Sequence, residues 1–288
     1  MKFPIVDLAT DEFPRALLEI PQPPTKLNYR GVLPPCDLSL LAIVGSRKYT
    51  NYGKQAVEEL VAGLKGYPVG IVSGLALGID SLAHEAALKN SLYTLSIPGG
   101  GLEDESIYPA SHKGLAHRIL EADGGLLSEF APDFRATAWS FPQRNRLVAG
   151  ICKATLLIEA GEKSGTLITA RMTADYNREL LAVPGSIFSA TSAGTNQFLK
   201  LGAIPVTNSR DILEALHIET EAKEIQQPEL GLSPEELMIL EILNEPTHKD
   251  ELIRKITLPT PAASQLLMMM EIKGLIFSEQ NIYRRPIK

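Results

Sequence analysis

The stretch LLAIVGSRKYTNYGKQAVEELVAGLKGYPVGIVSG, residues 40–74, decides the fold class. Two short apolar runs, 40–45 and 69–74, each end in glycine, and between them KQAVEELVAGL at 54–64 repeats its apolar residues with helical spacing. A buried strand, a helix and a second buried strand in that order are typical of the βαβ unit of a parallel sheet.

The same alternation continues to residue 216. Further runs of strand length lie at 92–101, 125–130, 154–161, 178–185 and 203–207, and further helical patterns at 79–89, 113–122, 165–177, 195–202 and 209–216. Because right-handed crossovers place helices on both faces of such a sheet, we expect an α/β fold. Its core would be a Rossmann-like, doubly wound, mostly parallel sheet over residues 38–216.

Different patterns flank this core. Residues 1–37 hold closely spaced prolines, which favour extended backbone, and we interpret them as an arm that packs on the core. Residues 217–231 are polar and acidic and are predicted to be a linker. Residues 232–288 show helical patterns followed by a possible hairpin, which is the order of a winged-helix domain, and Ser233 with Glu236 fits a capping box.

The predicted third helix of this small domain, 260–274, offers few side chains that could read DNA bases. It carries three consecutive methionines, 268–270, which cannot all face one core, so at least one is expected on the surface. A protein-interaction or regulatory role and a purely structural role both stay open for the domain.

Composition excludes several classes of protein. The net charge is −6, but residues 38–216 carry 16 Lys and Arg against 17 Asp and Glu, so a local basic groove could exist in the core. Two cysteines cannot form a disulfide framework or a zinc cluster. No apolar run reaches membrane-spanning length and no secretion signal is recognisable, so we expect a cytoplasmic protein that does not enter a membrane.

The loops after the predicted strands combine glycine with Ser, Thr or a charged residue. Glycine lets backbone N–H groups approach an anion closely, and a following helix N-terminus adds partial positive charge. Several such loops on one sheet edge favour a polyanion or a nucleotide. Neither the G-x-G-x-x-G fingerprint nor a P-loop is present, which argues against a dinucleotide or NTPase site.

Basic residues in these loops suggest single-stranded nucleic acid. Arg47, Arg144, Arg146 and Lys163 could meet phosphates, and Phe141 could stack on a base. Two alternatives stay open: Arg144 and Arg146 could pair with carboxylates, and Phe141 could be a core residue.

The titratable residues form no convincing catalytic set, and the sequence predicts no catalytic residue, metal or cofactor. Asp80 and His84 share one helix face, which fits acid–base chemistry but fits local hydrogen bonding better. Residues 103–105 could bind a metal or form a solvated acidic loop. Glu129 and Glu159 follow strands, where either could be a base or could neutralise the arginines.

Taken together, these motifs resemble the bacterial DNA-processing protein A family, also called DprA or Smf. The matching stretches stand in the family's order and include AIVGSRKYTNYG, SGLALGIDSLAHEAAL, PGGGLEDESIYP, FPQRNRLVAGI, EAGEKSGTLITA and GTNQFLKLGA. The resemblance implies a homodimer that binds single-stranded DNA, protects it and helps to load the RecA recombinase in natural transformation, and that is not an enzyme. It implies DNA contacts at Gly45, Ser46, Arg47, Ser73, Gly74, Gly78, Phe141, Arg144, Asn145, Arg146, Lys163, Ser164, Gly165 and Thr166.

Two other functions stay open. The loop IPGGGLEDE, 97–105, partly resembles that of the lysine-decarboxylase-like phosphoribohydrolases, in which case Glu105 would be needed for release of a free base from a nucleotide. Alternatively, the chain could be an adaptor whose winged helix carries the function.

Overall fold

The structure, a computed structural model, describes residues 2–162, 164–219, 233–243, 245–256, 258–279 and 281–285. The chain divides into two compact units, Met1–Thr220 and Glu221–Lys288, which are described separately. The predicted linker, 217–231, lies outside the described residues from residue 220 onward.

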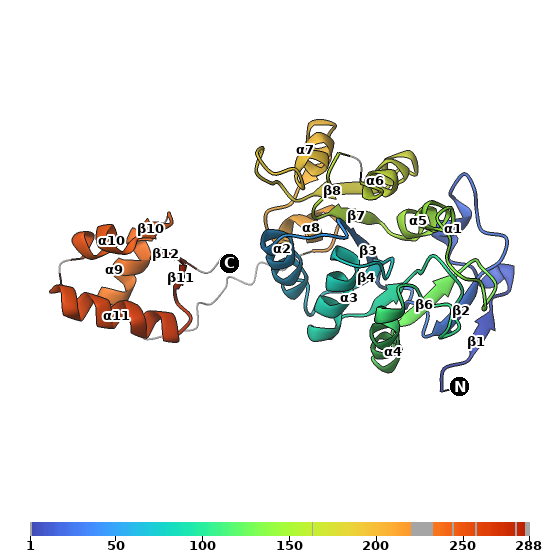
Figure 1. Ribbon diagram of the computed structural model, residues 1–288, viewed down its shortest axis with the longest axis horizontal. Helices are drawn as coiled ribbons and strands as arrows, with labels where there is room; N and C mark the ends of the chain where they lie inside the picture. Colours follow the sequence, from blue (N-terminus) through green and yellow to red (C-terminus); the bar gives the residue numbers. More distant parts are fainter. Residues whose placement is uncertain are drawn as a thin grey trace. The chain divides into compact units, whose positions relative to one another are not determined.

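Parallel strands form the centre of the larger unit (Figure 1). Their order across the sheet is β6-β5-β4-β3-β7-β8-β9. The run at 40–45 that opened the sequence analysis becomes β3, and all of its residues are buried because helices cover both faces of the sheet. This arrangement confirms the predicted doubly wound fold. The strands are β3 (Ser39–Val44), β4 (Val69–Ser73), β5 (Thr94–Ser96), β6 (Gly125–Ser128), β7 (Ala154–Leu157), β8 (Glu179–Ala182) and β9 (Ile204–Pro205).

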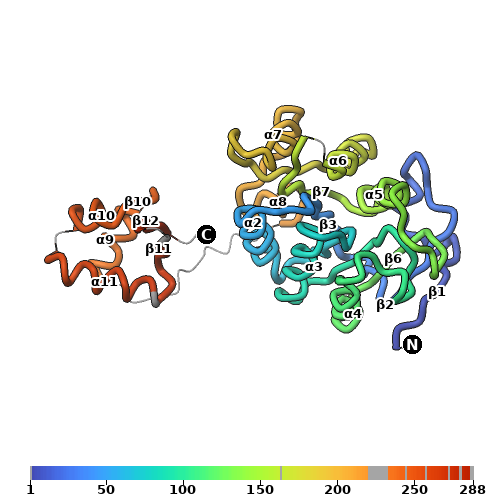
Figure 2. The backbone as a smooth tube through the Cα atoms, in the orientation of Figure 1, coloured from blue at the N-terminus to red at the C-terminus, as the bar shows by residue number. Residues whose placement is uncertain are grey.

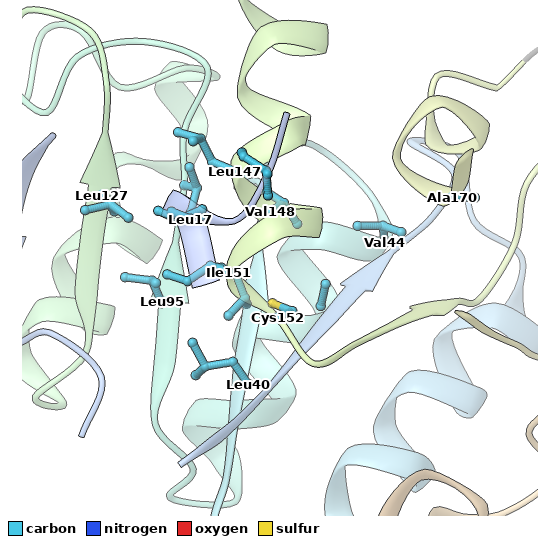
Figure 3. Close-up of a cluster of buried hydrophobic side chains, with 14 of the residues drawn as sticks. Leu17, Leu40, Val44, Leu95, Leu127, Leu147, Val148, Ile151, Cys152 and Ala170 are labelled. Atoms are coloured by element: carbon cyan, nitrogen blue, oxygen red, sulfur yellow. The ribbon is translucent and has the colours of Figure 1, made fainter. Parts of the chain in front are cut away.

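Two hydrophobic layers hold the helices on the sheet. Alternate residues of β3 face opposite sides, so that Leu40 and Val44 pack in one layer and Leu41 and Ile43 in the other. Figure 3 shows the first layer, in which side chains of α5 pack against the sheet. The first layer contains α5 (Ser140–Ile151), α6 (Thr166–Asp175) and α7 (Ala193–Lys200), and the second contains α2 (Asn51–Ala62), α3 (Ile79–Lys89) and α8 (Ser209–Ala215). Beside β6, α4 (Lys113–Glu121) packs with its own buried cluster and follows the short 3₁₀ turn η2 (Ala110–His112).

The first 37 residues contain more regular structure than the sequence analysis predicted. They form β1 (Ile5–Asp7), the 3₁₀ turn η1 (Thr10–Glu12), α1 (Arg15–Leu18) and β2 (Asn28–Gly31). β2 pairs antiparallel with β6 and β1 pairs antiparallel with β2, which extends the sheet beyond its parallel part (Figure 2). Leu17 and Leu27 are fully buried, so this segment completes the core of the larger unit.

Helix α5 was also not predicted. Its sequence, SFPQRNRLVAGI, places Pro142 in the first turn, where a missing backbone N–H costs nothing because that group has no partner within the helix. Leu147, Val148 and Ile151 then pack on the sheet.

The smaller unit has the predicted helices and hairpin. Ser233 Oγ accepts a hydrogen bond from the Glu236 backbone at 3.2 Å and Glu236 Oε2 accepts one from the Ser233 backbone at 2.9 Å, which confirms the capping box. Met268 and Met269 are exposed and Met270 is buried, as their consecutive positions require. The elements are α9 (Pro234–Ile242), β10 (Thr247–His248), α10 (Lys249–Lys255), α11 (Thr260–Ile272), β11 (Phe277–Glu279) and β12 (Ile282–Arg284), with the strands in the order β10-β12-β11. In neither unit does the described part contain a helix with the length and hydrophobicity needed to cross a bilayer.

Candidate nucleic-acid interface

A cavity lies at the carboxyl ends of the central strands. β3 and β7 are neighbours in the sheet, but the chain leaves them towards opposite faces, to α2 and to α6. A crevice forms at such a switch point because the two connections diverge. Here it has a volume of about 740 Å³, and we call it the strand-end cavity. It is lined by Val44, Gly45, Ser46, Arg47, Ala76, Asp80, Ala138, Phe141, Pro142, Arg144, Asn145, Gly161, Ser164, Gly165, Thr166, Ile168 and Thr169.

The loop after β3 forms one wall of the cavity. The Ser46 N–H donates to the Glu159 carbonyl at 2.7 Å, and the Ser46 carbonyl accepts from the Ile79 N–H at 3.1 Å, so the loop is tied to the end of β7 and to the start of α3. Gly78 permits this second contact. Its φ is +89°, and a Cβ atom there would lie 2.3 Å from the Ser46 carbonyl oxygen.

Arg47 stands exposed beside this wall. Its guanidinium carbon lies 5.4 Å from the centre of the Phe141 ring, within the range of a cation–π contact. The ring is half-buried and lies over Gly99, where a Cβ atom would be 2.6 Å from Phe141 Cδ1. On its other side Phe141 contacts Tyr108, with ring centres 5.6 Å apart. An exposed cation and a half-buried aromatic ring therefore stand together at the cavity.

Arg144 forms the floor of the cavity and is only 5% exposed. Its Nη1 donates to the Gly74 carbonyl at 2.6 Å and also to the Ile97 carbonyl. Asp80 accepts hydrogen bonds from the N–H groups of Gly74 at 3.2 Å and Ala76 at 3.4 Å. Burial lowers the pKa of Arg144 to about 10, an effect that the charge of Asp80 opposes. Burial raises the pKa of Asp80, which Arg144 counteracts. Arg144 thus holds two strand-end loops in place.

The start of α6 closes the opposite side. Thr166 Oγ1 donates to the Gly45 carbonyl at 3.0 Å, and Ser164 Oγ donates to Thr166 Oγ1 at 3.0 Å. Gly165 precedes the helix and is exposed. The first turn of a helix carries unpaired N–H groups and partial positive charge, so this wall favours an anion.

Of the thirteen predicted contact residues that the structure describes, nine line the cavity and four do not. Gly45, Ser46, Arg47, Phe141, Arg144, Asn145, Ser164, Gly165 and Thr166 line the cavity. Ser73, Gly74 and Gly78 do not line it: Ser73 is buried and donates to the Ile43 carbonyl at 2.7 Å, and the two glycines hold loops. Lys163 lies outside the described residues.

Arg146 points away from the cavity. It is 4% exposed, forms an ion pair with Glu129, and donates to the Gln22 carbonyl at 2.6 Å. In the structure Arg146 therefore pairs with a carboxylate, which the sequence analysis had left open as the alternative to a phosphate contact. The helical period explains why Arg144 faces the cavity and Arg146 does not. Arg144 and Asn145 follow Phe141 at i+3 and i+4 and share its helix face, whereas Arg146 at i+5 lies on another face.

Sequence reasoning missed Ile168 and Thr169, in the first turns of α6, and gave Asp80 no place in the cavity. The spacing in the sequence could have indicated Ile168 and Thr169. They follow Gly165 at i+3 and i+4, which puts both side chains on the helix face that begins at the cavity.

His84 and Glu159 each make hydrogen bonds to a neighbouring threonine. His84 is fully buried with Nδ1 2.7 Å from Thr94 Oγ1, and burial lowers its pKa to about 3, so it is neutral at pH 7. Glu159 accepts hydrogen bonds from the Thr50 N–H and hydroxyl at 2.9 and 2.6 Å. Within the described residues, no three His, Cys, Asp or Glu side chains are placed to hold a metal ion.

In the acidic loop at 103–105, Asp104 and Glu105 form ion pairs. Asp104 pairs with Arg30 at 2.6 Å and with His117 at 3.2 Å. Glu105 is 76% exposed, lies 3.5 Å from Lys113 Nζ, and does not line the strand-end cavity. The phosphoribohydrolase alternative therefore gains no support from the position of this glutamate.

Comparison with known proteins shows the family of the chain. The profile of the family described as DNA recombination-mediator protein A matches residues 5–217. The chain belongs to this family. Residues 223–280 match the DprA winged helix domain, which agrees with the fold of the smaller unit and confirms that part of the sequence analysis.

Curated proteins and solved structures of the recombination-mediator family cover most of the chain. Protein Smf of Escherichia coli is 34% identical over 98% of this chain and 77% of its own length. DNA processing protein DprA of Streptococcus pneumoniae is 39% identical over 74% of each chain. The crystal structure of the pneumococcal protein superposes with a TM-score of 0.68 at 37% identity, covering 76% of each chain. A Helicobacter pylori structure, reported for the single-stranded DNA binding mode of its DNA processing protein A, superposes with a TM-score of 0.65 at 31% identity, covering 75% of this chain and 96% of that one.

Proposed function

We propose that this protein is a recombination mediator in DNA processing that binds single-stranded DNA in the strand-end cavity. One observation carries the proposal: Arg47, the Phe141 ring and the start of α6 meet at one cavity. Cationic and N–H groups suit phosphates, and a fixed ring suits a base. These are the elements of a site that follows a single strand without reading its sequence.

The half-buried position of Phe141 favours single strands over duplex. A ring recessed beside a cavity can stack only on a base whose face is free, and bases in a duplex already stack on their neighbours. We therefore assign Phe141 to a base and Arg47 to a phosphate.

The remaining contacts divide into binding and supporting groups. Ser46, Asn145 and the 164–166 turn would contact the strand directly, and Arg144 would add positive charge from the floor of the cavity. Arg146 would act by holding α5 to the 129–139 loop through Glu129. A DNA contact by Lys163 stays a prediction.

The test is fluorescence anisotropy of a labelled oligonucleotide at two salt concentrations, with single- and double-stranded competitors. Arg47→Ala should weaken binding and reduce the slope of log K against log salt by about 0.7, the value for one phosphate on a single strand. Phe141→Ala should cost about 1–3 kcal/mol and leave the slope unchanged. Lys65→Ala is a matched control, because Lys65 is exposed beyond the far end of α2, at the opposite edge of the sheet.

Three outcomes would contradict the proposal. The wild-type protein could fail to bind at low salt, duplex could compete as well as single strand, or Arg47→Ala could keep both the affinity and the salt slope.

RecA loading in natural transformation and a homodimer are further parts of this proposal, supported by family membership. Around α7, the exposed side chains of Ile187, Phe188 and Leu201 offer apolar area for a protein partner. Light scattering of the purified chain and a RecA-filament assay on protected single strands test the two parts separately. The absence of enzymatic activity and the cytoplasmic location stay predictions.

A further inference from the structure

An aromatic cluster stands in the 129–139 loop, between β6 and α5. Phe130 and Phe134 stack with their ring centres 4.7 Å apart and an interplanar angle of 18°. Trp139 lies 5.7 Å from each of them, at angles of 78° and 61°. The three rings form a small apolar cluster in a loop whose other side chains are mostly polar or small.

The cluster is held by hydrogen bonds to the loop that follows β5. The Gly101 N–H donates to the Phe134 carbonyl at 2.8 Å, and the Glu103 N–H donates to the Pro132 carbonyl at 3.0 Å. Ser140 Oγ is buried and donates to the Gly99 carbonyl at 2.6 Å, which holds the residue next to Trp139. Trp139 therefore stands on a segment that is fixed by hydrogen bonds to this neighbouring loop.

Trp139 nevertheless remains 59% exposed. A large aromatic side chain usually buries most of its surface, so an exposed ring on a fixed support indicates a contact surface. The ring immediately precedes α5, and its neighbours Ala138 and Phe141 line the strand-end cavity. The exposed ring thus adjoins the proposed DNA site.

The surroundings of Trp139 fit a base better than an apolar protein face. Thr137 and Arg135 are exposed in the same loop, and among the described residues Arg135 makes no hydrogen bond or ion pair. The 129–139 loop carries Glu129, Asp133 and Arg135. Because Glu129 is paired with Arg146, the charges of Asp133 and Arg135 balance one another near the ring. A single flat ring within a polar rim offers the area of one base, with a cation available for its phosphate.

We propose that Trp139 is a second stacking position, which takes a base of the single strand just outside the strand-end cavity. The inference rests on the proposed function and extends it, because it predicts where the strand leaves the cavity. Trp139 at the start of α5 and Phe141 within its first turn point to different sides of the helix. The strand would pass around the start of α5 between the two rings.

Trp139 is the only tryptophan of the chain, so its fluorescence reports on this position directly. The full-length protein is titrated with oligothymidylates of increasing length at low salt, and tryptophan emission and the anisotropy of a labelled oligonucleotide are recorded together. We expect quenching to follow binding once the strand is long enough to pass the cavity. Trp139→Ala should then weaken binding of long strands by about 5-fold or more, the lower end of the range for one stacked base, and should leave the shortest binding strands unaffected.

Two variants separate stacking from folding. Trp139→Phe keeps a ring and should retain most of the affinity for long strands. If Trp139 were needed only for folding, Trp139→Ala would instead weaken the binding of short and long strands alike. Leu18→Ala removes an exposed apolar side chain from α1 and should bind as wild type.

The possible results are distinguishable. Saturated binding of a long strand without any change in tryptophan emission, or equal affinity of Trp139→Ala and wild type, would overturn the second stacking position while the proposed function stands. Failure of wild type to bind any strand would overturn both.

Discussion

Replacement of Arg144 by methionine tests how the strand-end cavity is held open. Methionine has a similar length but no donor, so the Gly74 and Ile97 carbonyls each lose a hydrogen bond. Asp80 is left buried without its neighbouring cation. Loss of donors to buried carbonyls costs about 1–3 kcal/mol each, and removal of one partner of a buried charge pair costs about 3–5 kcal/mol. Because the same guanidinium makes all these contacts, the costs overlap, and we expect a total of about 3–5 kcal/mol.

Urea unfolding followed by Trp139 emission measures this loss in the larger unit. With an m value of about 2 kcal/mol/M, the midpoint should fall by about 2 M. Asp80→Asn in the Arg144→Met background should recover part of the loss, because it removes the unpaired charge. The loss should also be larger at pH 8 than at pH 5. Burial raises the pKa of Asp80 and Arg144 counteracts this, so removal of Arg144 raises that pKa further, and stability linked to a raised carboxyl pKa is lost as the pH rises. A fall of less than about 1 kcal/mol would refute this account and would mean that the floor of the cavity does not depend on Arg144.

Three further predictions follow from the same contacts. Arg146→Met should lower unfolding stability by about 3–5 kcal/mol, because Glu129 loses its buried partner, and should leave the salt slope of DNA binding unchanged, unlike Arg47→Ala; an altered slope would place Arg146 on a phosphate. Burial holds the pKa of His84 at about 3 rather than 6.5, so the unfolding stability should fall by about 1.4 kcal/mol per pH unit as the pH drops below 6.5. Urea unfolding at pH 7 and pH 5 measures this fall, and an equal pH dependence in His84→Gln would contradict the prediction. Deletion of residues 228–288 should spare single-strand binding in the anisotropy assay, and its loss would favour the adaptor alternative.

The parallel core could be predicted from sequence because its strands are buried on both faces. Each therefore appears as a continuous apolar run ending in glycine or a polar loop, as 40–45 and 69–74 do. The position of the cavity follows from the same pattern, since the carboxyl ends of parallel strands meet at one edge.

Elements stabilised by distant partners could not be predicted in this way. The strand β2 contains Arg30, which is 2% exposed because its guanidinium donates to the Leu102 carbonyl and to Asp104, far along the chain. In α5, Arg144 and Arg146 occupy buried positions, so polar residues interrupt the apolar period that would have indicated a helix. Without that helix the two arginines looked equivalent in sequence, although only Arg144 faces the cavity.

The two edge strands of the large sheet limit how copies of the protein can associate. β1 has three residues and β9 has two, one of which is Pro205, with no N–H to donate. Short edges and proline leave little backbone for a second sheet to extend, which is how β proteins avoid edge-to-edge aggregation. If copies bind one DNA strand as proposed, contacts between them would therefore have to use side-chain surfaces instead of strand pairing.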